Sequence, residues 1–281
     1  MNSDTNFAAA PIFNEGGLAH IATAASNPTL TQQSWSTFFR VVINDIYHYQ
    51  DAARYAVEIL GKRRISVVND GSTFTRPMAE GFRDVAQELG AEIPTFVSVV
   101  RGKDDYSEAA QQLAAVESDV IFFVVIEKVA VIIAKQVREA GVTVPFFATD
   151  GLKPFPYFAT WDYQVDGPYY TNVCADPKVK ERAGAMVERY VDRYGEEPTV
   201  YMVEAYDAAN IILNALKQTG TEHPNRAQVL EEIAATKDFE GLSNMISFDQ
   251  HGDIMSPEVG IYKVEDKSLN FVGFTKNLLS E

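Results

Sequence analysis

The sequence predicts an α/β fold in which helices cover a parallel β-sheet. Short runs rich in β-branched and aromatic residues alternate with amphipathic segments of helical period, and this alternation repeats at least four times. The run Val120–Ile126 is apolar throughout, which is typical of a central parallel strand covered on both faces. The length of 281 residues suits one large α/β domain or two linked lobes.

The first half of the chain carries the regular alternation. Expected strands cover residues 18–23, 37–42, 65–69, 95–100, 120–126 and 145–149, and expected helices cover 49–60, 76–89, 106–116 and 129–140. The helix at 76–89 has Met78, Phe82, Val85 and Leu89 at helical spacing. Gly90 directly follows this helix, as Gly141 follows the helix at 129–140, and glycine commonly ends helices.

The second half of the chain changes in character. Long helices are expected at residues 179–194, 200–217 and 227–235, and strands at 244–248, 258–264 and 270–274. Asp249, His251 and Asp253 lie in a turn-rich stretch with Gly252, so a polar hairpin turn is the interpretation favoured over a metal or catalytic cluster. The coarse picture is a compact α/β unit with helical and β-rich additions.

Charge and composition exclude several classes of partner. The chain has 24 basic and 39 acidic residues, a net charge of −15, which argues against nucleic acid or an anionic membrane surface as the partner. No apolar run approaches the roughly 20 residues of a membrane span, and the first residues do not resemble a signal peptide. We expect a removed leader or an unnatural start. Cys174 is the single cysteine, so no internal disulfide forms, and a buried thiol is expected.

Enzyme and cofactor motifs are missing from the sequence. No glycine-rich phosphate loop and no Gly-x-Ser-x-Gly turn occurs, and the four histidines are isolated from one another. A zinc site needs clustered His or Cys ligands. The sequence therefore predicts no enzyme, no cofactor and no metal site.

Polar residues follow several expected strands, where ligands of parallel sheets bind. Four such loops cover residues 22–28, 69–75, 126–127 and 150–151. Each could be an ordinary turn between a strand and a helix. Together they predict a small-molecule site, in which the small side chains of residues 22–28 expose N–H groups and hydroxyls to a carboxylate.

Segments spread over nearly the full length resemble the type I periplasmic binding proteins of the leucine/isoleucine/valine-binding family. They cover residues 16–31, 39–40, 65–70, 81, 104–107, 136–141, 149–151, 204–207 and 248–253. No one segment is specific, but their order and spacing carry the resemblance. It implies two doubly wound lobes joined by a hinge, with residues 1–44 and 175–248 in the first lobe and 45–174 and 249–281 in the second.

The resemblance also implies a ligand site in the cleft between the lobes. By position, Ser3, Ala24 and Ser26 would hold the α-carboxylate of an amino acid. On the second lobe, Asp150 would meet the α-ammonium, and Phe74 and Ile126 would line the side-chain pocket.

Three positions depart from the family pattern and leave the ligand's identity open. Phe74 and Ile126 stand where the family commonly has tyrosine, and Thr75 stands in place of glycine. The two aromatic-position changes remove hydroxyls and make the expected pocket more apolar.

Family members normally have two further βα units before the residue that matches Ser3. The first lobe is therefore expected to be incomplete, through truncation or because a homodimer partner covers its exposed sheet edge.

The function implied is that of a periplasmic or extracytoplasmic receptor. It would bind an amino acid or related small carboxylate and deliver it to the membrane permease of an ABC transporter. The alternative is a sensory domain of the same fold that acts on a partner protein instead of in transport.

Overall fold

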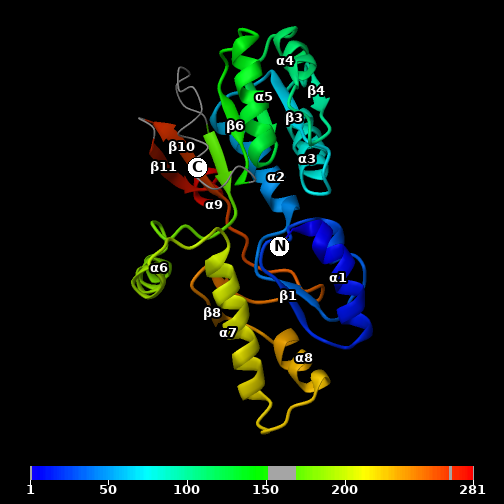
Figure 1. Cartoon of the computed structure of the whole chain (residues 1–281), viewed down its shortest axis with the longest axis vertical. Coiled ribbons are helices and arrows are strands. Elements are labelled where there is room, and N and C mark those ends of the chain that lie inside the picture. Colours follow the sequence, from blue (N-terminus) through cyan, green and yellow to red (C-terminus); the bar gives the residue numbers. More distant parts are fainter. Residues whose placement is uncertain (1, 151–168, 266–267, 281) are drawn as a thin grey trace. The chain divides into compact units, whose positions relative to one another are not determined.

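The computed structural model describes residues 2–150, 169–265 and 268–280 (Figure 1). The chain divides into two compact units, each made of two separate stretches. Unit 1 comprises Met1–Asp45 and Cys174–Pro257, and unit 2 comprises Ile46–Val173 and Glu258–Glu281. Residues far apart in the sequence therefore complete each unit.

A seven-stranded sheet forms the centre of the described part of unit 2, in the order β11-β10-β7-β6-β5-β3-β4. The strands are β3 (Ile65–Asn69), β4 (Phe96–Ser98), β5 (Val120–Val124), β6 (Phe146–Ala148), β7 (Tyr169–Asn172), β10 (Gly260–Glu265) and β11 (Ser268–Phe274). The five strands from β7 to β4 run parallel, whereas β10 and β11 pair antiparallel. Every residue of β3 and β5 is buried. The sequence predicts this for β5, whose run is apolar throughout.

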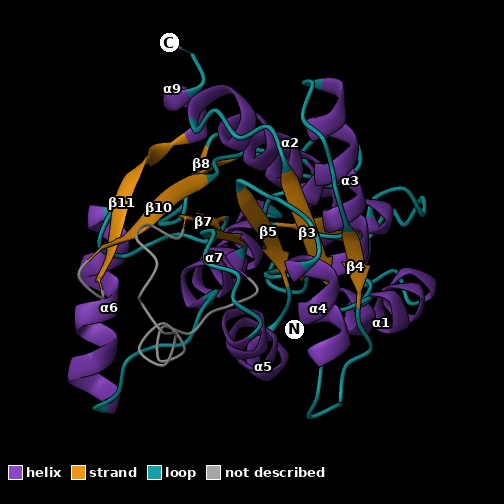
Figure 2. Cartoon of the chain, turned by 90° about the horizontal axis from the view of Figure 1, so that it is seen from above, coloured by secondary structure: helices purple, strands orange, loops and turns teal. Residues whose placement is uncertain are grey.

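Helices cover both faces of this sheet (Figure 2). They are α2 (Asp45–Arg54), α3 (Thr75–Glu88), α4 (Ser107–Ala114), α5 (Glu127–Glu139) and the short α9 (Thr275–Leu278). A π-helical turn, Tyr55–Ile59, extends α2. One face packs against α2 and α3, where Phe82 stacks on Phe122 with ring centroids 3.6 Å apart. The other face packs against α4 and α5.

The described part of unit 1 contains two small sheets and four helices, of which α7 is the longest. Its elements are α1 (Ser3–Glu15), β1 (His20–Ala22), a 3₁₀ turn (Pro28–Leu30), β2 (Phe38–Arg40), α6 (Glu181–Tyr194), α7 (Met202–Gln218), α8 (Arg226–Ala234), β8 (Phe239–Glu240) and β9 (Met245–Ile246). β1 and β2 are parallel, and β8 and β9 are antiparallel. Leu30 and Phe38 form a core with alanines of α1 and of the loop after β1.

Helix α1 and strand β7 are among the elements that have no counterpart in the expected set. Helix α1 is not predicted by the sequence because Ala8–Ala10 and Pro11 give no clear apolar stripe. Its start is nevertheless well specified, since the Asn2 side chain accepts a hydrogen bond from the Thr5 N–H at 3.0 Å. Strand β7 was also not expected, and it joins the parallel and antiparallel parts of the sheet.

Residues 249–257, which the resemblance places in the second lobe, belong to the same compact unit as residues 1–45. The reason is direct bonding: the Gly252 carbonyl accepts the Arg40 N–H at 2.9 Å, and Asp253 forms an ion pair with the Arg40 side chain. These contacts fix the stretch to β2.

Candidate functional site

Three of the expected ligand residues lie at one edge of the unit 2 sheet. β3, β5 and β6 are adjacent and parallel, so their carboxyl ends meet at the same edge. Phe74 precedes α3 in the loop after β3, Ile126 precedes α5 after β5, and Asp150 follows β6. Phe74 and Ile126 are half-buried, and Asp150 is buried. The structure thus supplies two apolar side chains and one carboxylate at this edge.

Asp70 joins the loops that carry Phe74 and Ile126. One carboxylate oxygen accepts the Thr75 hydroxyl at 2.6 Å, and the other accepts the Ile126 N–H at 3.1 Å. Asp70 therefore fixes the end of β3 relative to the end of β5. The Thr75 side chain is fully buried and its hydroxyl is bound to Asp70, so the change from glycine adds no hydroxyl to an exposed pocket wall.

A buried histidine lies beside the carboxylate of Asp150. His48 of α2 is fully buried, with Nε2 2.6 Å from the Thr171 hydroxyl oxygen and Nδ1 4.0 Å from Asp150 Oδ1. Burial lowers the pKa of His48 from 6.5 to about 4, although the negative charge of Asp150 acts in the opposite direction. The sequence did not indicate His48, because nothing around it in α2 marks a functional residue.

The depressed pKa of His48 makes protein stability depend on pH. Above pH 6.5 the residue is neutral in both states, whereas between pH 6.5 and 4 the unfolded chain binds a proton that the folded chain does not. We expect the free energy of unfolding to fall by roughly 3 kcal/mol from this residue as the pH drops through that window. Urea unfolding at pH 7 and pH 4.5 measures it. In the variant His48→Gln the free energy of unfolding should fall less between these two pH values. An equal fall in the variant would mean that the lowered pKa of His48 is not the cause.

The remaining expected ligand residues lie in unit 1. Ala24 and Ser26 lie in the loop between β1 and the 3₁₀ turn, with Ala24 half-buried and Ser26 buried. Ser3 is buried at the first position of α1, and α1 packs against β1 and the 3₁₀ turn. The helix that begins at Ser3 and the loop that carries Ser26 thus share one small core.

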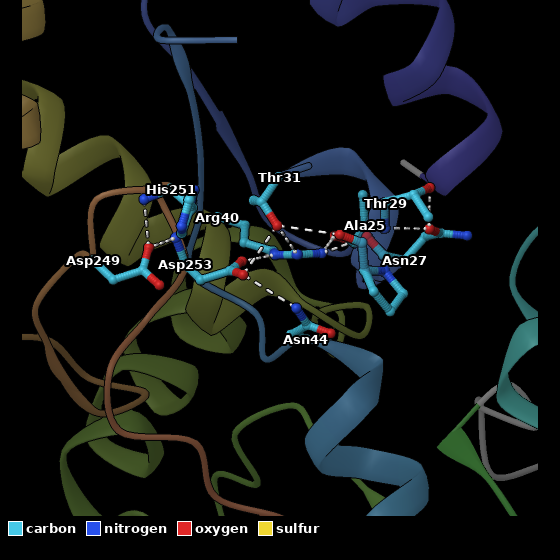
Figure 3. Close-up of polar contacts among 10 residues, drawn as sticks. Ala25, Asn27, Thr29, Thr31, Arg40, Asn44, Asp249, His251 and Asp253 are labelled. Carbon is cyan, nitrogen blue, oxygen red and sulfur yellow. Dashed lines mark hydrogen bonds and ion pairs between the residues drawn. The ribbon is translucent and has the colours of Figure 1, made fainter. Parts of the chain in front are cut away.

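A buried arginine holds this loop in place (Figure 3). Arg40 is fully buried and donates from Nη1 to the carbonyls of Ala25 at 3.2 Å and Asn27 at 2.8 Å. Its Nη2 donates to the Thr31 hydroxyl at 2.9 Å, and its Nε pairs with Asp253. The guanidinium therefore connects the Ala24–Ser26 loop to the hairpin near the end of unit 1. This role was not predicted, although a charged residue within the apolar run at 38–43 was a usable signal.

The hairpin at residues 249–253 is structural, as the sequence predicts. Asp249 Oδ1 accepts the N–H groups of His251 at 2.8 Å and Asp253 at 2.9 Å, which closes the turn. Among the described residues, no group of three or more His, Cys, Asp or Glu side chains is placed to hold a metal ion. Cys174 is buried, as expected.

The family model described as "Periplasmic binding protein" matches residues 1–268. The chain belongs to this family. The family consists of solute-binding proteins and is not enzymatic, so the prediction of a non-enzyme is confirmed. No helix in the described part of this binding protein is long and apolar enough to cross a membrane.

Individual relatives agree with the family assignment. A "Leu/Ile/Val-binding protein homolog 1" of Brucella melitensis is 25% identical over 276 residues, which is 97% of this binding protein and 73% of the relative. The leucine-binding protein LivK of Thermotoga maritima is 27% identical, with a TM-score of 0.86 over 97% of this chain and 77% of its own. The predicted type I fold and the resemblance to the leucine/isoleucine/valine-binding proteins are confirmed.

A third relative shows how far the fold extends to other ligands. A solute-binding protein of Rhodopseudomonas palustris, solved in complex with benzoate, has a TM-score of 0.83 at 16% identity and covers 97% of this chain and 75% of its own. At that identity the likeness concerns the fold alone.

Proposed function

We propose that this binding protein is an extracytoplasmic receptor for an amino acid, which it delivers to the permease of an ABC transporter. The ligand's α-ammonium would bind Asp150, and its side chain would lie against Phe74 and Ile126. Its carboxylate would bind the unit 1 group of Ser3, Ala24 and Ser26. The relatives named for leucine or leucine/isoleucine/valine binding support this choice of ligand class.

The observation that carries the proposal is the composition of the unit 2 edge. It combines a buried carboxylate, Asp150, with two half-buried apolar side chains, Phe74 and Ile126, on adjacent parallel strands. A carboxylate in a poorly solvated position favours a cationic partner, and charge-assisted hydrogen bonds are the strong ones. An apolar amino acid has a cation and an apolar side chain on the same carbon. A carboxylic acid without an ammonium would gain nothing from Asp150.

The test compares ligands with and without an ammonium group. We expect Asp150→Asn to weaken binding of L-leucine and similar amino acids about 10- to 100-fold, because it removes a charge-assisted hydrogen bond of roughly 1.5–3 kcal/mol. Binding of 4-methylpentanoate, which has the leucine skeleton without the ammonium, should stay the same or improve. Isothermal titration measures both ligands.

Two further variants complete the design. Asp84→Asn removes a carboxylate from the exposed surface of α3 and should change neither affinity. Ser26→Ala should weaken both ligands alike, because both carry the carboxylate. If Asp150→Asn binds leucine as tightly as the unaltered chain does, the ammonium assignment is wrong.

A further inference from the structure

His48, Thr171 and Asp150 form a buried polar group behind the binding edge of unit 2. Each comes from a different part of the fold: His48 from α2, Thr171 from β7 and Asp150 from the end of β6. The side chain of His48 is fully buried and that of Asp150 is 4% exposed. The group is thus shielded from bulk water. Electrostatic interactions between its members are therefore stronger than they would be in water.

The contacts of Thr171 determine which nitrogen of His48 carries the proton. Thr171 Oγ1 lies 3.4 Å from the Ala148 carbonyl, which only accepts, so the threonine donates to it. The hydroxyl oxygen then accepts from His48 Nε2–H at 2.6 Å. The neutral imidazole therefore has its lone pair on Nδ1. No described residue makes a hydrogen bond to Nδ1, which lies 4.0 Å from Asp150 Oδ1.

We propose that His48 is a positioning residue for the ligand's ammonium. While Nδ1 of His48 is unprotonated, the ammonium interacts with the negative charge of Asp150. Once Nδ1 is protonated, the imidazolium competes with the ammonium for that charge. The inference deepens the proposed function and rests on the assignment of Asp150 to the ammonium. The pKa of His48 then depends on whether a cation is bound to Asp150.

The surrounding charges are consistent with this role. Burial lowers the pKa of His48 to about 4, so the residue is neutral at pH 7. Among the described residues, Asp150 is the group whose charge raises the pKa of His48. Asp45, a buried carboxylate one turn earlier on α2, does not contribute to that shift, and Thr171 is uncharged. Asp51, one turn along α2, is instead hydrogen-bonded to Thr275 at 2.5 Å. An ammonium bound to Asp150 would oppose protonation of His48, and by linkage protonation would oppose ammonium binding.

Nuclear magnetic resonance of protein labelled with ¹⁵N-histidine tests the inference directly. His48→Gln identifies the His48 signals among those of the other histidines. We expect a neutral Nε2–H tautomer at pH 7, and a lower pKa of His48 in Asp150→Asn, because the charge that raises this pKa is removed. A cationic His48 at pH 7, or a pKa that is unchanged in Asp150→Asn, would overturn the proposal.

Adding ligand separates this inference from the proposed function. L-leucine should lower the pKa of His48 as Asp150→Asn does, whereas 4-methylpentanoate should not. If leucine has no effect but Asp150→Asn does, the coupling of His48 to Asp150 stands and the assignment of the ammonium fails. If leucine binds but neither change moves His48, the receptor function stands and the role of His48 fails.

Affinity measurements at pH 7.5 test the positioning role of His48 even if the protein unfolds at the low pH at which His48 titrates. His48→Leu cannot donate to Thr171, and we expect it to bind L-leucine roughly five- to tenfold more weakly. His48→Gln retains an N–H donor of similar reach and should recover most of that loss. Equal affinities of the leucine and glutamine variants would show that the hydrogen bond to Thr171 does not position the site.

Discussion

Arg40→Met should lower the free energy of unfolding of unit 1 by about 3–5 kcal/mol, the usual cost of breaking a buried ion pair by removing one partner. The side chain of Arg40 is fully buried and that of Asp253 is 14% exposed, so the remaining carboxylate is poorly solvated. The carbonyls of Ala25 and Asn27 also lose their donor. Methionine keeps the apolar bulk of the arginine stem, which confines the effect to the lost charge and hydrogen bonds.

Denaturant unfolding measures the loss, and hydrogen exchange of the α1, β1 and β2 amides assigns it to unit 1. Arg76→Met is the matched control, because Arg76 pairs with Glu80 on an exposed face of α3 and such pairs contribute less than about 1 kcal/mol. Adding Asp253→Leu to Arg40→Met should recover part of the stability, since it removes the uncompensated charge. If Arg40→Met lowers the free energy of unfolding no more than Arg76→Met does, water must reach the Arg40–Asp253 pair.

The position of the candidate site residues in unit 2 follows largely from the sequence, because local patterns determine it. The strand at Ile65–Asn69 is found as expected, and a parallel sheet brings the residues after its neighbouring strands to one edge. The amino-acid sequence alone therefore suffices to group Phe74, Ile126 and Asp150. The five apolar residues of β5 indicate its central place equally well.

Contacts between distant residues explain what the sequence did not predict. Arg40 and Asp253 are 213 positions apart, so neither residue indicates the other locally, and the sequence did not show that residues 249–257 belong with β2. His48 lies on α2, whose sequence gives no sign that one turn of it meets β7 and the end of β6. Such positioning residues become visible only when tertiary packing is known.

The second large effect is expected in unit 2, where Phe122→Ala should cost about 3–5 kcal/mol of unfolding free energy. Phe122 lies in the middle of β5, fully buried, and is stacked on Phe82 with an interplanar angle of 9°. The Phe147 ring is a further neighbour, with its centroid 5.8 Å from that of Phe122. Alanine leaves a cavity between β5 and α3 that the surrounding strands cannot fill without moving.

Hydrogen exchange of the β3, β5 and β6 amides, together with denaturant unfolding, measures this cost. Phe271→Ala is the control in the same unit, since Phe271 is 37% exposed on β11 and should cost clearly less. Because β5 ends beside Ile126, the Phe122 variant should also bind L-leucine more weakly at temperatures where it is still folded. Retained stability in Phe122→Ala would show that α3 can close onto the sheet, and the stacked pair would then not be what fixes the site edge.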